Sequence, residues 1–325
     1  MDFNSLKDAP RLLIEADLVP LQGTRFQPTG FPDLGAATYR LPNQEKTQML
    51  LLESAQSVAN RLENTILDEA NQDVVAPLKG IPYVVVKQGD KVLTNSLLEA
   101  HRLNSPYIMG TKQKKTALFD KIQAELEIAP ETPVDFHRLA TVLAKYDLNC
   151  LLHGIFFEKI AGALRIARTL SGFIEAKNVS IVSSGGVKHD RVDATGKAKD
   201  KGGAGEGYGN VPYHREEYTA EKITAYFSLD LAQIRGYRLG VDVENLLIAI
   251  ALYKIQRFLD RGLRLRTACD LEATKIEVKR PEKFELPSHA ELAKALLSLV
   301  KAAASAFANP PITVVQYQAE ESKKK

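Results

Sequence analysis

The order of hydrophobic and polar residues along the chain predicts a mixture of helices and strands. Apolar residues at helical spacing predict helices over 50–66, 96–103, 116–126, 134–146, 242–259 and 288–308, the last opening on the capping-box pair Ser288 and Glu291. Alternating or short apolar runs predict strands over 11–19, 83–87, 91–93, 164–166, 178–182, 223–230 and 263–267. Because strands and helices do not alternate regularly, the pattern favours an α+β fold over a doubly wound parallel sheet.

This pattern stops between Ser184 and Tyr213, where glycine, lysine and other polar residues leave almost nothing to bury. Structureless connections beyond about 12–15 residues are uncommon and are usually functional or disordered. We therefore interpret the segment as an arm, in which glycines allow close approach to a partner and lysines suit a phosphate. Its glycines do not fit a nucleotide-binding loop, because they fall two residues apart at Gly203, Gly205, Gly207 and Gly209. Composition alone leaves disorder and nucleic-acid contact both open.

A chain of 325 residues with 45% hydrophobic and 26% charged residues has the composition of a soluble globular protein. The two cysteines, Cys150 and Cys269, are too few for a disulfide framework and are typical of a reducing cytoplasm. The longest apolar run, 246–253, is shorter than the roughly 20 residues of a membrane span, and the first residues lack a signal-peptide pattern. We therefore expect a cytoplasmic protein without a membrane partner. The net charge of +3 does not by itself indicate nucleic acid.

No motif supports a metal site or a catalytic centre. Cys150 and His153 form one Cys-x-x-His half-site, but no second half-site has a suitable spacing, and structural zinc normally takes four protein ligands. Neither His-Glu-x-x-His nor Gly-x-Ser-x-Gly occurs, so no nucleophile or base is assigned. We expect no metal and no cofactor, and a buried thiol at Cys150.

Basic and amide side chains gather at three places beside the predicted strands. The loop 22–30 carries Gln22, Thr24, Arg25 and Gln27 among glycines and prolines, a mixture that suits contact with a sugar-phosphate chain. Two pairs flank strands, Arg165 with Arg168 and Arg264 with Arg266, and the period of a strand puts the second pair on one face. For the loop the alternative is an ordered turn, and for each arginine pair it is a solvated strand face. Taken together, the three groups favour a sheet that faces RNA.

Five strings carry a resemblance to a known family. They are 8–16, 22–35 (QGTRFQPTGFPDLG), 53–63, 94–108 (TNSLLEAHRLNSPYI) and 262–271 (GLRLRTACDL). These strings resemble the Cas-seven backbone subunit, of the RAMP superfamily, from type I-U (I-G) CRISPR effector complexes. The resemblance implies one elaborated RRM-like ferredoxin domain over 1–325, with a fingers insertion over about 94–150, a protruding glycine- and lysine-rich thumb over 185–213, and a polar tail over 318–325.

The resemblance also implies a function. Such subunits bind CRISPR RNA along its sugar-phosphate chain, stand in several copies in a helical array with other effector-complex subunits, and present the guide to target DNA. The candidate RNA contacts are Gln22, Thr24, Arg25, Gln27, His101, Arg102, Arg165, Arg168, Lys188, Arg191, Lys197, Lys199, Lys201, Arg264 and Arg266. We expect no catalytic residue. Two nuclease alternatives remain: target-RNA cleavage through Asp33, and precursor-RNA processing through one of His101, His153, His189 and His214.

Overall fold

The computed structural model describes residues 1–31, 34–111, 114–128, 133–160, 164–189, 191–192 and 209–317. Within them the largest sheet has seven antiparallel strands in the order β14-β15-β1-β13-β12-β5-β4. Their bounds are Arg11–Pro20 (β1), Thr38–Arg40 (β4), Gln48–Glu53 (β5), Leu170–Lys188 (β12), Val211–Asp230 (β13), Leu263–Arg266 (β14) and Cys269–Arg280 (β15). The predicted mixture of strands and helices without regular alternation is confirmed.

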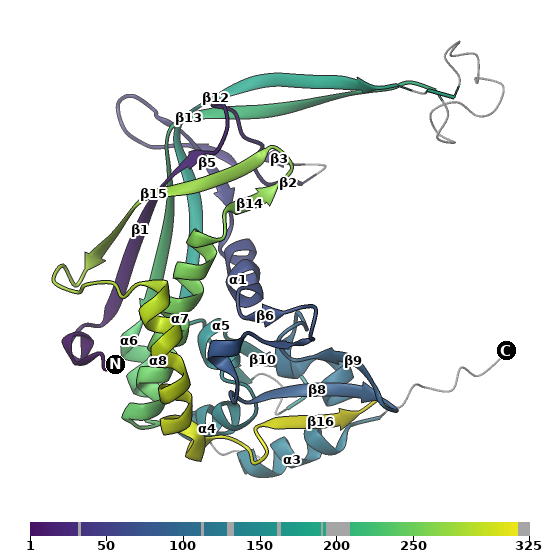
Figure 1. Ribbon diagram of the computed structural model, residues 1–325, viewed down its shortest axis with the longest axis vertical. Coiled ribbons are helices and arrows are strands. Elements are labelled where there is room, and N and C mark those ends of the chain that lie inside the picture. The colour runs from purple at the N-terminus through teal and green to yellow at the C-terminus, as the bar shows by residue number, and fades with distance from the viewer. Residues whose placement is uncertain are drawn as a thin grey trace.

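One face of this sheet is covered by helices because its strands alternate apolar and polar residues. In β1 the side chains of Leu12, Ile14, Ala16 and Leu18 are buried, and the residues between them are not. The covering helices are Ala55–Asn64 (α1), which packs on β12, and Val241–Asp260 (α7), which packs on β13 and is backed by His289–Ala302 (α8) (Figure 1). A short helix, Leu231–Gly236 (α6), links β13 to α7.

A second group of elements, here called the lower lobe, lies below the main sheet in Figure 1. Its sheet has the order β16-β8-β9, with Tyr83–Gln88 (β8), Lys91–Asn95 (β9) and Ile312–Gln316 (β16), and β16 runs parallel to β8. Its helices are Pro106–Met109 (α2), Ala117–Leu126 (α3), Phe136–Tyr146 (α4) and Asn149–His153 (α5), followed by the pair Ile155–Phe157 (β10) and Leu164–Ile166 (β11). The segment 94–150, predicted to form the fingers insertion, supplies α2, α3, α4 and the first two residues of α5.

Shorter elements complete the chain. Strand pairs are formed by Gly30–Phe31 (β2) with Gly35–Ala36 (β3) and by Leu67–Asp68 (β6) with Asp73–Val74 (β7). Single 3-10 turns occupy Asn4–Leu6, Ala76–Leu78, Arg102–Asn104 and Ala303–Ala306. No helix among the described residues is long and apolar enough to cross a membrane.

Strands β12 and β13 form one antiparallel hairpin whose register runs from Leu170 opposite Leu229 to Lys188 opposite Val211. Its outer part, 179–188 with 211–220, extends beyond the rest of the sheet at the top of Figure 1, and we call it the ribbon. The arm predicted to begin near residue 185 is therefore β structure up to Lys188. Gly185 and Gly186 pair with His214 and Tyr213, because glycine keeps the backbone groups that a ladder needs even though it has no side chain to bury. Residues 193–208 lie outside the described residues.

Two sequence-based predictions of helix are wrong. Residues 50–53 belong to strand β5 and pair with β12; Leu50 and Leu52 are fully buried, so their apolar run fits a strand as well as a helix. The helix starts only after Ser54, whose Oγ accepts a hydrogen bond from the Ser57 amide at 3.2 Å.

The predicted helix over 96–103 is instead a series of turns. Asn95 Oδ1 accepts hydrogen bonds from the amides of Leu97 and Leu98, both at 3.0 Å, in place of helical carbonyls. Arg102 has a φ of 50°, a left-handed conformation that a continuing helix does not tolerate. The other predicted helices and the 83–93 hairpin are present, and Ser288 and Glu291 form both bonds of the capping box.

Candidate nucleic-acid interface

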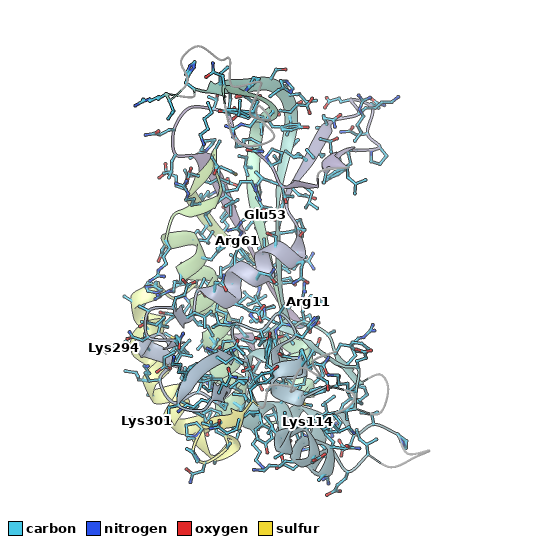
Figure 2. The ribbon with its side chains drawn as sticks, turned by 90° about the vertical axis from the view of Figure 1, so that its right-hand side faces the viewer. Arg11, Glu53, Arg61, Lys114, Lys294 and Lys301 are labelled. Carbon is cyan, nitrogen blue, oxygen red and sulfur yellow. The ribbon has the colours of Figure 1, made fainter. Side chains whose placement is uncertain are left out.

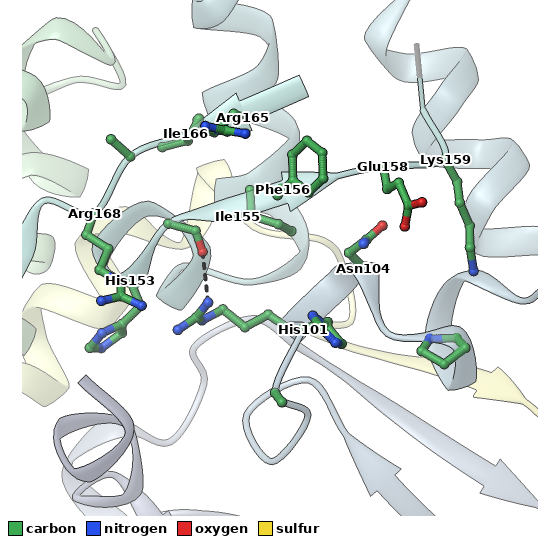
Figure 3. A pocket seen from close by; sticks show the side chains of 15 residues that line it. His101, Asn104, His153, Ile155, Phe156, Glu158, Lys159, Arg165, Ile166 and Arg168 are labelled. Atoms are coloured by element: carbon green, nitrogen blue, oxygen red, sulfur yellow. Dashed lines mark hydrogen bonds between the residues drawn. The ribbon is translucent and has the colours of Figure 1, made fainter. Parts of the chain in front are cut away.

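A cavity of about 670 Å³ lies in the lower lobe between the Arg102–Asn104 turn and the β10–β11 pair. Its ionisable lining residues come from separate segments and are mostly basic, namely His101, Arg102, His153, Lys159, Arg165 and Arg168, with one acidic residue, Glu158. In Figure 3, Arg168 and His153 lie at one end, Glu158 and Lys159 at the other, and Arg165, Phe156 and His101 between them. We call this the basic cavity. It brings together His101 and the pair Arg165 and Arg168, which the sequence indicated as separate candidates.

The wall formed by β10 and β11 combines a cation with an exposed aromatic ring. Arg165 and Phe156 are directly opposite each other in this strand pair, and the guanidinium carbon lies 5.1 Å from the ring centroid. Phe156 is 41% exposed, so its ring remains accessible. An aromatic face beside a guanidinium offers a nucleotide both a stacking surface and a phosphate partner.

Arg168 connects the basic cavity to helix α1. Its guanidinium donates to the backbone carbonyl of Ala55 at 3.4 Å and to the side-chain oxygen of Gln56. Partial burial and the nearby Arg102 lower the pKa of Arg168 from its ordinary value, and Glu63 opposes this effect. The two hydrogen-bond partners of Arg168 are neutral groups, so no carboxylate of the described residues is bonded to it directly.

Arg102 points into the protein, unlike its neighbour His101. Its Nε and Nη2 donate to the two carboxylate oxygens of Glu63 at 2.6 and 2.7 Å, and its Nη1 donates to the carbonyl of Gly154 at 3.1 Å. This bidentate pair joins α1 to the lower lobe. Arg102 also lines the basic cavity, but we leave it out of the proposed contact surface because Glu63 neutralises its charge and three of its five donors are engaged.

A buried polar cluster lies behind the basic cavity. Lys254, fully buried in α7, donates from Nζ to Asn149 Oδ1 at 2.6 Å and lies 2.8 Å from His153 Nε2. Burial and the neighbouring Lys254 lower the pKa of His153 well below its usual range, so the ring is neutral near pH 7. The other ring nitrogen, Nδ1, has no hydrogen-bond partner among the described residues.

The loop 22–27 is held against the start of the ribbon. The amide and carbonyl of Phe26 both bond to Tyr218, and the Gln27 amide donates to Ala268. Arg25 pairs with Glu217 at 3.3 Å, and the Gln27 side chain accepts from Arg215 at 3.2 Å. Gln22 and Thr24 remain exposed, and Arg25 is half exposed, so these three residues remain candidates for contact with a partner.

The arginines at 264 and 266 have different environments. Arg264 is 72% exposed and lies 3.5 Å from Asp270. Arg266 donates to the carbonyl of Gln27 at 2.9 Å and pairs with the buried carboxylate of Glu53, which also receives Arg61 and the Ser57 hydroxyl. Arg266 therefore stabilises the fold, and we leave it out of the proposed contact surface.

The remaining candidates lie on or beyond the ribbon. Lys188 is exposed at the end of β12, and Arg191 is exposed nearby. Lys197, Lys199 and Lys201 lie outside the described residues, as do Asp33 and the tail 318–325. RNA contacts at these five basic residues stay predictions, as does the nuclease alternative through Asp33.

Two lining residues were missed at the sequence level, Lys159 and Phe156. Both sit in the sequence Ile155-Phe156-Phe157-Glu158-Lys159, where one exposed aromatic alternates with two buried residues. The sequence contains no sign of this exposed ring, because Ile155, Phe156 and Phe157 form a continuous apolar run and only the fold distinguishes them. No group of three or more His, Cys, Asp or Glu side chains suited to a metal ion occurs within the described parts of the chain.

Comparisons with known proteins identify the family. The chain matches the family of CRISPR-associated protein GSU0053 (Cas_GSU0053) over residues 12–181. Among solved structures it resembles a chain of a "CRISPR RNA-guided surveillance complex, pre-nicking" (10% identity, 90% of this chain and 88% of that chain, TM-score 0.45) and Csc2 of Thermofilum pendens (10% identity, 92% and 79%, TM-score 0.31). No curated protein sequence matches it.

The matched residues include β1 from its second residue onward, α1 and every residue that lines the basic cavity. They cover more than half of the chain and agree with the resemblance to Cas-seven backbone subunits carried by its sequence strings. This chain belongs to the CRISPR-associated GSU0053 family.

Proposed function

We propose that this chain is a backbone subunit that binds CRISPR RNA along its sugar-phosphate chain and presents it to target DNA. The observation that carries the proposal is the basic cavity, in which Lys159, Arg165 and Arg168 line the same space as the exposed ring of Phe156 inside the family-matched region. Cations for phosphates and an aromatic face for stacking require no particular base sequence. A guide strand needs such contacts, because its bases must stay free to pair.

The proposal extends to assembly. A net charge of +3 is compatible with RNA binding if several copies each neutralise a few phosphates of one strand, because weak sites on one strand add together. In this arrangement the antiparallel sheet corresponds to an RRM-like palm, segment 94–150 to the fingers and the ribbon to the base of the thumb. A cytoplasmic location stays a prediction from the sequence.

Replacing Arg165 with alanine is expected to weaken binding of single-stranded RNA by about tenfold, equivalent to about 1.4 kcal/mol. The change removes one phosphate partner and the cation beside Phe156. The slope of log affinity against log salt should fall by about 0.7. Fluorescence anisotropy over a salt series measures both quantities. Lys294→Ala, on the exposed side of α8, is the matched control (Figure 2); equal affinities for the two variants would contradict a role for the basic cavity.

Co-expression with a CRISPR array tests the function as a whole. RNA of defined length should purify with the wild-type chain, because each bound copy protects the strand along its backbone. Arg165→Ala should reduce the amount recovered relative to Lys294→Ala. Purification of the wild-type chain free of RNA, in the presence of a transcribed array, would count against the proposal.

The nuclease alternatives predict products, whereas the binding proposal predicts none. Complementary RNA or precursor RNA incubated with the purified complex and magnesium should remain intact. Regularly spaced cuts that disappear with Asp33→Ala would overturn the non-catalytic proposal. Among the histidines considered for precursor processing, His153 is buried and neutral, which disfavours it as an acid or base acting on RNA.

A further inference from the structure

A second hollow, of about 210 Å³, lies where the ends of α1 and α7 meet the start of β14. Four arginines line it, Arg61, Arg257, Arg261 and Arg264, together with Asn64 and Thr65 and without any acidic residue. We call it the arginine hollow. Arg61 and Arg264 each have a carboxylate partner outside the hollow, Glu53 at 3.4 Å and Asp270 at 3.5 Å. Arg257 and Arg261 have no ion-pair partner within the described residues, so the hollow keeps an excess of positive charge that favours a bound anion.

The hydrogen bonds of these arginines leave donors unused. Arg257 donates from Nη1 to the Tyr253 hydroxyl at 2.8 Å, but its buried Nε has no partner, and neither has the buried Nε of Arg61. Arg261 is exposed and has no ion-pair partner within the described parts of the chain. Buried donors without partners are uncommon in proteins. Their presence here points to a ligand that accepts several hydrogen bonds and carries negative charge, as a phosphate does.

A row of amide side chains connects this hollow to the basic cavity. Gln56, Asn60 and Asn64 are spaced four residues apart on the exposed side of α1, opposite the buried Val58, Ala59 and Leu62. Gln56 Nε2 donates to Asn60 Oδ1 at 2.8 Å. Gln56 also accepts from Arg168 of the basic cavity, and Asn64 lines the arginine hollow. We call the three residues the amide row.

Helix α1 crosses the middle of the molecule between the ribbon and the lower lobe, both of which extend to the same side (Figures 1 and 2). Ten residues at about 1.5 Å each give it a length of about 15 Å. Asparagine and glutamine both donate and accept hydrogen bonds without carrying charge. They therefore suit the sugar hydroxyls and phosphates of an RNA strand that passes over them.

We propose that the arginine hollow is a phosphate site for the same RNA strand that occupies the basic cavity, and that the amide row holds the strand between the two sites. This inference rests on the proposed function, because it concerns where the bound RNA goes after it leaves the basic cavity. The three surfaces together form one path across α1, with cations at both ends and neutral amides between them.

Oligoribonucleotides of graded length test the path with the full chain. Arg261→Glu should leave the binding of the shortest oligoribonucleotides unchanged, because these fill only the basic cavity. It should weaken the binding of longer ones by about tenfold or more, and lower their salt slope by about 0.7. Asn60→Asp, which puts a negative charge in the middle of the amide row, should show the same dependence on length. Lys294→Glu provides the matched charge reversal away from the path.

The outcomes separate this inference from the proposed function. If Arg165→Ala weakens binding at every length while Arg261→Glu and Asn60→Asp match Lys294→Glu at every length, the path across α1 is wrong and the proposed function stands. If Arg165→Ala and Arg261→Glu both match the control, the proposed function fails as well. Thermal unfolding of each variant verifies its fold. The path is supported if Arg261→Glu unfolds at the wild-type midpoint temperature and loses affinity only for the longer oligoribonucleotides.

Discussion

Replacing Glu53 with glutamine should lower the free energy of unfolding by about 3–5 kcal/mol. The carboxylate is fully buried and receives Arg61, Arg266 and the Ser57 hydroxyl. Removing its charge leaves two partly buried guanidinium groups without a counter-charge. Chemical denaturation measures the loss. Because Arg61 and Arg266 also donate to the carbonyls of Leu265 and Gln27, the same change should loosen the attachment of α1 to β14 and to the loop 22–27.

Glu216→Gln is the matched control, since Glu216 is exposed on the ribbon and undergoes the same chemical change. It should alter stability by less than about 0.5 kcal/mol. Adding Arg266→Met to Glu53→Gln should recover part of the loss, because it removes one of the uncompensated charges. Equal stability of the Glu53 and Glu216 variants would contradict the assignment of Glu53 as the centre of this network.

The free energy of unfolding should rise with pH between about 7 and 9 through Lys254. Burial lowers the pKa of this lysine from 10.5 to about 7; the nearby Glu63 and Asp147 oppose the shift, and Arg102 adds to it. Between these two pKa values the unfolded chain holds a proton that the folded chain has released. Stability then increases with pH, by at most about 1.4 kcal/mol per pH unit. Over two pH units the contribution of Lys254 should be about 2 kcal/mol.

Lys254→Met isolates this contribution. The two cysteines titrate in both proteins, so the difference between wild type and variant reports on Lys254. The free energy of unfolding of both proteins is measured by denaturation at pH 7 and at pH 9. The wild type should gain about 2 kcal/mol relative to Lys254→Met between the two pH values. Lys294→Met, at an exposed lysine, should keep the wild-type pH dependence. If Lys254→Met also kept the wild-type pH dependence, Lys254 would be charged in the folded state throughout this pH range.

Much of the fold could be predicted from the sequence because the burial of each element follows its own periodicity. The alternation in 11–19 and the helical spacing in 242–259 each produce the expected element with the expected buried side. Periodicity failed at 50–53, where a short apolar run fits a strand or a helix. Only pairing with β12, more than a hundred residues away, decides between them.

The candidate site was less predictable, because a basic residue in the sequence carries no sign of its partner. Arg165 and Arg102 look alike as surface candidates and both line the basic cavity, yet Arg102 is bound to Glu63, 39 positions away, whereas Arg165 lies over the ring of Phe156. Arg266 likewise meets Glu53, 213 positions away. A sequence indicates where cations are, and the fold determines which of them a carboxylate has already neutralised.

The parallel pairing of β16 with β8 determines when the lower lobe is completed during protein synthesis. β8 ends at Gln88, but its neighbour β16 begins only at Ile312. While the intervening chain is made, one edge of β8 has exposed backbone groups, and unpaired strand edges of this kind promote association with other chains. Synthesis proceeds at about 5–20 residues per second, so this edge stays open for about 10–45 seconds. The lower lobe therefore gains its last strand only after nearly the whole chain has been translated.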